Sequence, residues 1–134
     1  MSIPKIRAAL EVALSGITPE LPTVFENIEY APVTGTAYQR VSISFAAPNN
    51  EEYGPNWQEL GIMHIGLFYP QSVGPSESDE RFELIRSAFA RGNSYTNGGV
   101  IVTINGTPEL TPGYNDGNYF VRPVRVRFYA NINL

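Results

Sequence analysis

Apolar residues at the start of the chain recur with the period of an α-helix. With a repeat of about 3.6 residues they fall within an arc of about 100°; they are Ile3, Ile6, Leu10, Ala13, Leu14 and Ile17. Ser2 is suited to cap this helix, Pro4 is tolerated in its first turn, and Gly16 is a suitable stop. The pattern predicts one helix with one buried face, opposite to Val12.

Alternating and continuous apolar runs then predict strands. Over 38–46 the inward positions are Val41, Ile43 and Phe45, and the outward ones are Arg40, Ser42 and Ser44. Residues 60–69 are apolar on both faces, which favours a central strand. The segment 18–32 holds three prolines, so we expect only a short edge strand there. Residues 48–58 are predicted to form a polar loop.

A second amphipathic helix is predicted after Gly74-Pro75-Ser76. Its first turn is acidic and its end is basic, as the helix dipole favours, with Glu77, Asp79 and Glu80 at the start and Arg86 and Arg91 near the end. Its predicted core stripe consists of Phe82, Ile85, Ala88 and Phe89. Gly92 is a suitable stop, and Leu84 lies off the stripe.

The last third of the chain is predicted to be β-structure. A strand over 100–104 leads to Asn105-Gly106, a strong two-residue hairpin signal, with a short return arm over 107–111. A loop over 112–117 precedes a final strand over 119–131. Along that strand one face carries Val124, Val126, Phe128 and Ala130, and the other carries Arg125, Arg127 and Tyr129.

This order of elements predicts an α+β fold, with two amphipathic helices packed on one face of a twisted, mainly antiparallel sheet. The chain of 134 residues has the usual size of one domain and contains no long linker. We therefore expect a single domain over 1–134.

The amino-acid composition excludes several kinds of site and partner. The chain has no cysteine, which excludes disulfides, thiolate metal sites and cysteine nucleophiles. His64 is the only histidine and lies among apolar residues, so a hydrogen-bonded strand histidine is the simplest interpretation. A net charge of −4 argues against nucleic acid or an anionic membrane as the primary partner. Glu11 interrupts the N-terminal apolar run, which favours a folded helix over a signal peptide.

No recognisable catalytic, cofactor or metal motif is present. The chain lacks a P-loop, a dinucleotide fingerprint and a nucleophile elbow. Asn115-Asp116-Gly117 lacks the other ligands of a calcium loop and is best interpreted as a turn. We therefore expect a protein that is not an enzyme and that needs no cofactor.

Arginine and tyrosine, which are enriched in protein interfaces, gather on the final strand. Arg122, Arg125 and Arg127 crowd this strand, and the outward pair lies beside Tyr129. Pairing within the chain and a nucleic-acid patch are the alternatives. The arginines would meet an acidic surface on a neighbouring copy. The remaining candidate interface residues lie in the polar loop and at the start of the second helix, and they are Glu51, Glu52, Tyr53, Trp57, Glu77, Asp79 and Glu80. Such opposite patches suit head-to-tail contacts between copies.

Several segments, in this order and spacing, resemble the tail-terminator-like family of tailed bacteriophages. They are Gly35-Thr36-Ala37-Tyr38-Gln39-Arg40-Val41, Arg81-Phe82-Glu83-Leu84-Ile85-Arg86, Phe89-Ala90-Arg91-Gly92, Asn97-Gly98-Gly99-Val100 and Tyr119-Phe120-Val121-Arg122-Pro123-Val124-Arg125-Val126. The resemblance covers essentially the whole chain, including the opening helix.

The resemblance implies a small α+β virion subunit that assembles into a ring, usually a hexamer. Such a ring caps the tail tube when its polymerisation ends and provides the surface for head attachment. The implied partners are further copies of the chain, the tail tube protein and a head–tail connector protein, with no membrane and no sequence-specific nucleic acid, although DNA would pass through the ring. Assembly in the host bacterial cytoplasm follows from the same resemblance.

Two other functions remain open from the sequence. One is a different head–tail connector or a tail tube component. The other, from another class, is a hydrolase or a carbohydrate-binding module, since Tyr53, Trp57 and Tyr114 on polar loops would be able to stack on sugars.

Overall fold

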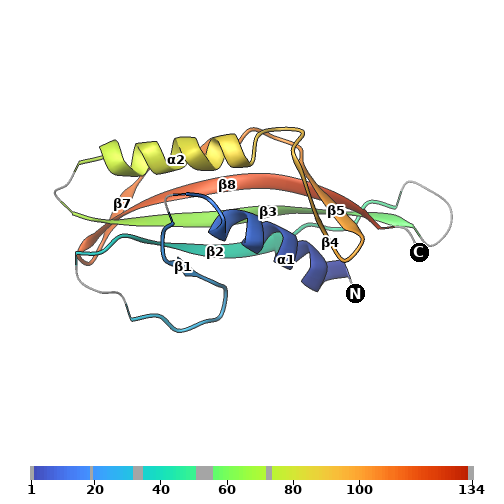
Figure 1. The fold of residues 1–134 in the computed structure, drawn as a ribbon, viewed down its shortest axis with the longest axis horizontal. Helices are drawn as coiled ribbons and strands as arrows, with labels where there is room; N and C mark the ends of the chain where they lie inside the picture. Colours follow the sequence, from blue (N-terminus) through green and yellow to red (C-terminus); the bar gives the residue numbers. More distant parts are fainter. Residues whose placement is uncertain (1, 19, 32–34, 51–55, 72–73, 133–134) are drawn as a thin grey trace.

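The computed structural model describes residues 2–18, 20–31, 35–50, 56–71 and 74–132, which form two helices and one sheet (Figure 1). The helices are α1 (Ser2–Ser15) and α2 (Ser76–Ala88). The strands are β1 (Thr23–Val24), β2 (Tyr38–Phe45), β3 (Trp57–Pro70), β4 (Ser94–Asn97), β5 (Val100–Ile104), β6 (Glu109–Leu110), β7 (Tyr114–Asp116) and β8 (Tyr119–Ile132).

The sheet is built around two long strands. Its order is β1-β2-β3-β8-β5-β4, and the short strands β6 and β7 also pair with β8. β1 pairs parallel to β2, whereas the other pairs among the described strands are antiparallel. β3 and β8 run side by side and curve together along the long axis of the molecule (Figure 1). The predicted α+β class is confirmed, with a sheet that is mixed and curled.

The core lies between the helices and the inward positions of the long strands. Strand register brings Val41, Ile65 and Val124 into one row, and Ile43, Met63 and Val126 into the next. α1 contributes Ile6, Leu10 and Leu14 to this core, and α2 contributes Phe82 and Ile85, with Phe89 directly after its end. α1 packs chiefly beside β4 and β5, whereas α2 lies along β3 and β8 (Figure 1). Burial of these side chains from water is the main stabilising term for the fold.

Most of the predicted periodicities are found in the structure. α1 ends one residue before Gly16, and Val12 is 68% exposed as predicted. β3 is central, between β2 and β8, in agreement with its two apolar faces. The inward face of β8 is buried and consists of Val124, Val126, Phe128 and Ala130. Ile3 departs from the prediction: it is 37% exposed, because the first turn of α1 extends past the core.

The predicted hairpin at Asn105-Gly106 is wrong. The turn lies earlier, at Gly98-Gly99, which joins β4 to β5 with Asn97 opposite Val100. Both glycines have positive φ, 56° and 85°, as a type I′ turn requires. The backbone N–H of Asn105 instead donates to the carbonyl of Arg127 at 3.2 Å. The predicted return arm therefore continues alongside β8, where β6 forms, and does not fold back on β5.

Two predicted loops also contain strand. The segment 112–117 includes β7, which forms a tight hairpin with β8 because Asp116 lies opposite Tyr119. β3 begins at Trp57, so this residue is paired opposite Ile132 and does not lie in a loop. In both cases pairing with β8 supplies the backbone hydrogen bonds that local residue preferences did not indicate.

Candidate interaction surfaces

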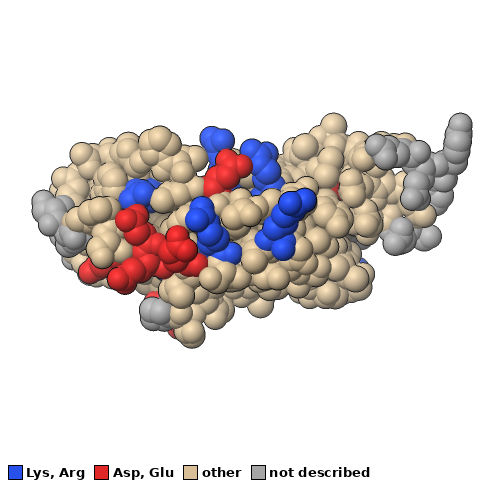
Figure 2. Space-filling model, turned by 90° about the horizontal axis from the view of Figure 1, so that it is seen from above, with Lys and Arg blue, Asp and Glu red and all other residues tan. Residues whose placement is uncertain are grey.

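The first surface is the exposed side of α2, where charges separate by sign along the helix. Seen from above, acidic side chains gather towards one end of this face and basic side chains towards its middle (Figure 2). Glu77 and Asp79 lie in the first turn of α2, and Arg86 lies in the last. Among the described residues, neither Glu77 nor Glu80 forms an ion pair, and both are exposed. This acidic end of α2 is thus available to another molecule.

Asp79 has a partner within the chain. Its Oδ1 accepts a hydrogen bond from Nη1 of Arg122 at 3.0 Å. Arg122 lies opposite the buried Leu67 in β3, so its side chain is on the sheet face that α2 covers. The aliphatic stem is largely buried, with 15% of the side chain exposed. Arg122 therefore ties the start of α2 to β8, which is the pairing within the chain that the sequence left open as an alternative.

The other two predicted arginines lie on the opposite face of β8. Nε of Arg127 donates to Oε1 of Glu109 in β6 at 3.2 Å, and both side chains are about half exposed. Arg125 is exposed and forms no ion pair with any described residue. Tyr129 shares this face and is half-buried. The three arginines thus divide between two faces of the sheet.

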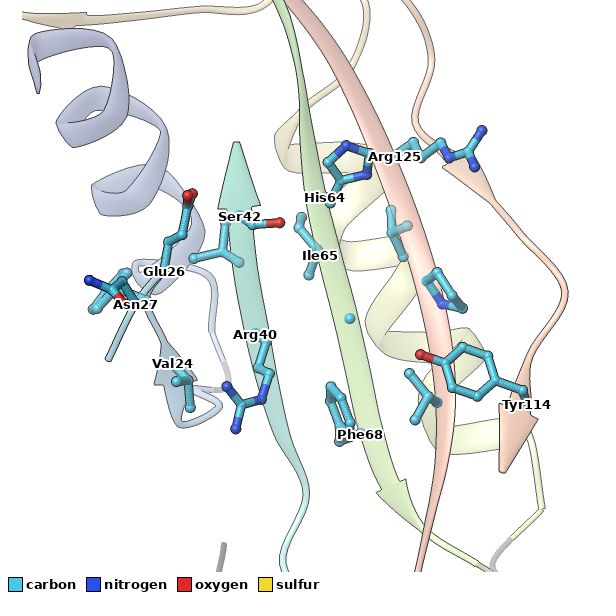
Figure 3. Close-up of a pocket in the computed structure, with 16 residues that line it drawn as sticks. Val24, Glu26, Asn27, Arg40, Ser42, His64, Ile65, Phe68, Tyr114 and Arg125 are labelled. Carbon is cyan, nitrogen blue, oxygen red and sulfur yellow. The ribbon is translucent and has the colours of Figure 1, made fainter. Parts of the chain in front are cut away.

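The second surface is a hollow of about 420 Å³ on the sheet face away from α2, here called the sheet-face groove (Figure 3). Its lining side chains come from β1, β2, β3, β7 and β8 and from the segment that follows β1. Strand register aligns Ser42, His64 and Arg125 across the sheet. In Figure 3, Arg40 and Phe68 lie lower on the same face, and Tyr114 projects from β7 at the side. The groove has an apolar floor and polar margins.

The charge of the sheet-face groove is positive. Arg40 and Arg125 are its cationic residues, and among its described lining residues Glu26 is the only carboxylate. Glu26 is already engaged: it accepts from Nη1 of Arg7 at 2.8 Å and from the backbone N–H of Ile43 at 3.0 Å. These two donors lower the pKa of Glu26. Glu109 lies opposite Arg125 in the pairing of β6 with β8, but it is bound by Arg127, so neither groove arginine forms an ion pair with a described residue.

His64 lies between Ser42 and Arg125 in its register row, and neither of these neighbours is a carboxylate. Burial, followed by the positive charge of Arg125, lowers the pKa of His64 from its usual value of 6.5. The imidazole is therefore neutral at neutral pH. Within the described parts of the chain, no cluster of three or more His, Asp or Glu side chains is placed to hold a metal ion. In those parts, no helix is long and apolar enough to cross a membrane.

The polar loop predicted as an interface is only partly described. Glu51, Glu52 and Tyr53 lie outside the described residues. Trp57 is partly buried against the core, and its Nε1 donates to Oε1 of Glu59 at 2.7 Å. Trp57 therefore contributes more to the end of the sheet than to a loop tip.

Trp57 and Tyr114 do not form one aromatic platform. They pair with β8 at Ile132 and Val121, which are about 35 Å apart along an extended strand. A sugar ring spans only a small part of that distance. The stacking site suggested by the sequence is therefore not assembled from these two residues.

The sequence did not single out Arg40 or Phe68 as interface residues. The alternation over 38–46 placed Arg40 outward, which was the available signal. What was missing is the register that brings Arg40, Gly66 and Pro123 into one row and places Arg125 in the next.

Comparison with known proteins identifies the family. A solved structure superimposes with a TM-score of 0.77 at 21% sequence identity, covering 96% of this chain and 94% of that one, which supports the fold. No curated protein sequence matches the chain. The model of the phage tail terminator protein family matches residues 5–128, nearly the whole chain. This chain therefore belongs to the phage tail terminator family.

Proposed function

We propose that this protein is the tail terminator of its phage: a ring subunit that caps the tail tube when polymerisation ends and presents the surface to which the head attaches. The observation that carries the proposal is the family match over 5–128. Membership of this family makes the chain a structural component of a phage tail. The ring, its six copies, its contacts with the tube and the connector, and its assembly in the host cytoplasm are parts of the proposal.

The distribution of charge supports a ring of identical subunits. The acidic end of α2 and the positively charged sheet-face groove lie on opposite faces of the sheet (Figures 2 and 3). Two complementary patches on opposite faces generate heterologous contacts, which close into a ring when the rotation between neighbours divides a full turn. A two-fold dimer would instead place the same patch on both sides of one interface.

The test is the length of tails made without the protein. A nonsense mutation in its gene should give tubes longer than wild type and no joined heads, as seen by electron microscopy. Supplying the protein in trans should restore both length and head joining. Tubes of normal length in the mutant would reject the terminator role, and if those tails also lacked heads they would identify the chain as a connector instead.

A biochemical experiment tests the same proposal on purified components. The protein should bind the end of isolated tail tubes and block their further growth, whether or not it forms rings in solution. Multi-angle light scattering gives the number of copies in solution, and negative-stain microscopy gives the state at the tube end. A strict monomer that also leaves isolated tubes uncapped would contradict the proposal.

A further inference from the structure

The sheet-face groove is built to receive negative charge on a short, partly apolar element. Arg40 and Arg125 form no ion pair with described residues, and the nearby Glu26 is occupied by Arg7. Phe68 and Pro123 provide an apolar lining between the two cations. The guanidinium of Arg40 lies over the ring of Tyr38, 5.8 Å from its centroid, and keeps its hydrogen-bond donors for a partner. Guanidinium groups beside apolar surface are typical of interface residues, since they pair with carboxylates of a neighbour and stack on rings.

The same molecule carries matching carboxylates that the groove of that copy cannot reach. Glu77 and Glu80 are exposed on α2, whereas the groove opens on the other face of the sheet. The sheet lies between them, so contact between these groups requires a second copy of the chain. The overall charge of −4 leaves more acidic than basic groups on the surface, which favours a basic groove as the recognition point.

The spacing of the charged groups is compatible. Glu77 and Glu80 are three residues apart in α2, so their Cβ atoms lie about 5–6 Å from each other on one helix face. Arg40 and Arg125 are on β2 and β8, the two neighbours of β3, so their strands are about 10 Å apart. Figure 3 shows the two guanidinium groups directed towards opposite sides of the groove, so both side chains would turn inwards to converge on two carboxylates carried by one helical turn.

We infer that the acidic first turns of α2 in one subunit dock in the sheet-face groove of the next, with Glu77 and Glu80 facing Arg40 and Arg125. This inference rests on the proposed ring and names its subunit contact. Each subunit then offers the acidic end of α2 to one neighbour and its groove to the other. Asp79 is held by Arg122 within its own chain, which fixes α2 on the sheet and presents the adjacent glutamates in a constant position.

Charge reversal on each side tests the contact. The groove variant carries Arg40→Glu and Arg125→Glu, and the helix variant carries Glu77→Lys and Glu80→Lys. Each variant alone places like charges at the contact, and its assembly at a given protein concentration should fall at least about tenfold. Circular dichroism and thermal melting should show that both remain folded, because all four side chains are exposed.

Mixing the two variants provides the decisive result. A groove variant beside a helix variant restores opposite charges at every contact, so equimolar mixtures should assemble into rings with an even number of subunits. The matched control carries Lys5→Glu and Arg91→Glu, which changes net charge as much as the groove variant does but lies outside the groove lining and outside the acidic first turns of α2. It should assemble as the wild type does. Assembly is measured in solution by light scattering and at the ends of isolated tubes by microscopy.

The outcomes separate this inference from the proposed function. Wild-type rings together with unimpaired assembly of either reversal variant would overturn the contact while leaving the terminator role intact. Loss of assembly in the groove variant alone, with a normal helix variant, would assign the groove to a different acidic partner and overturn the second copy as its occupant. Failure of two folded variants to assemble when mixed would also overturn it. A wild-type chain that neither forms rings nor caps tubes would reject the proposed function itself.

Discussion

Substitution of Gly61 by alanine should destabilise the fold, although alanine is normally preferred to glycine within a strand. Gly61 lies in β3 between Phe45 of β2 and Phe128 of β8, opposite both in register. The two phenyl rings meet edge to face above it, with centroids 5.9 Å apart. A Cβ at position 61 would lie 2.6 Å from Cζ of Phe128 and 2.6 Å from the carbonyl oxygen of Ser44.

The magnitude follows from two opposing effects. Removing the backbone freedom of glycine in the unfolded chain stabilises by about 0.4–1 kcal/mol. Overpacking of a filled core costs about 1–3 kcal/mol. The clash is not relieved easily, since the oxygen of Ser44 belongs to a paired backbone and Phe128 is 1% exposed. We expect a net loss of about 1–2 kcal/mol, or a fall in Tm of about 4–7 °C for a chain of this size.

The assay is thermal and urea denaturation of Gly61→Ala beside Gly66→Ala. Gly66 is in the same strand, and its added Cβ would come within 3.1 Å of the ring of Phe68, a partly exposed side chain on the groove face, and within 4 Å of no backbone atom among its three nearest neighbours. That control should change Tm by less than about 2 °C. A Gly61→Ala protein as stable as the wild type would refute the view that the phenylalanine pair fills the space above Gly61.

Three further predictions concern charged groups. The hydrogen bond from Arg7 lowers the pKa of Glu26 in the folded state. This carboxylate therefore contributes stability above its usual pKa of 4.5, and the contribution is lost as pH falls through its folded-state pKa. In Glu26→Gln, urea titrations should show a smaller loss of stability at acid pH. Because the pKa of His64 is lowered in the folded state, the unfolded state binds the proton more readily, and stability falls as pH drops below 6.5. In His64→Gln, urea titrations should no longer show this part of the pH dependence. A double-mutant cycle of Asp79→Asn and Arg122→Gln should give a coupling of about 0.2–1 kcal/mol, since Asp79 is 53% exposed and screened by water; a value above about 2 kcal/mol would show a buried pair.

The elements whose burial is one-sided could be predicted from the sequence. Val41 and Ile43 in β2, and Val124 and Val126 in β8, alternate with polar residues because only one face of each strand meets the core. The apolar residues of α1 recur with the helical period for the same reason. In these segments local pattern and tertiary burial agree, so the sequence carries the information directly.

The pairing of the strands was harder to predict from the sequence than their positions along the chain. Asn105-Gly106 and Asn97-Gly98-Gly99-Val100 both contain turn residues, and local preference alone chose the wrong one. The pairing of Ile104 with Phe128 draws the chain alongside β8, so Asn105 continues in that direction. This choice depends on a contact distant in sequence, which no property of the Asn-Gly dipeptide reports.

The sheet-face groove could not be predicted from the sequence for the same reason. Its lining comes from five strands, β1, β2, β3, β7 and β8, and from the segment after β1, and each outward residue looks like ordinary solvent-facing surface in the sequence. Arg40 and Arg125 become neighbours through the register of β3 with both adjoining strands. The sequence therefore identified outward arginines, but their gathering into one surface belongs to the sheet.

The register of β8 links stability to the proposed assembly. Arg122 faces α2 and holds Asp79, whereas Arg125, an odd number of residues further on, faces the groove. A slip of one residue would exchange these faces and also expose the buried row that includes Val124, so the core fixes the direction in which each arginine projects. One strand thus orients the acidic helix on one side and the basic groove on the other. If the two surfaces meet between subunits, their relative angle, and with it the closure of the ring, is set by the same pairing that buries the core.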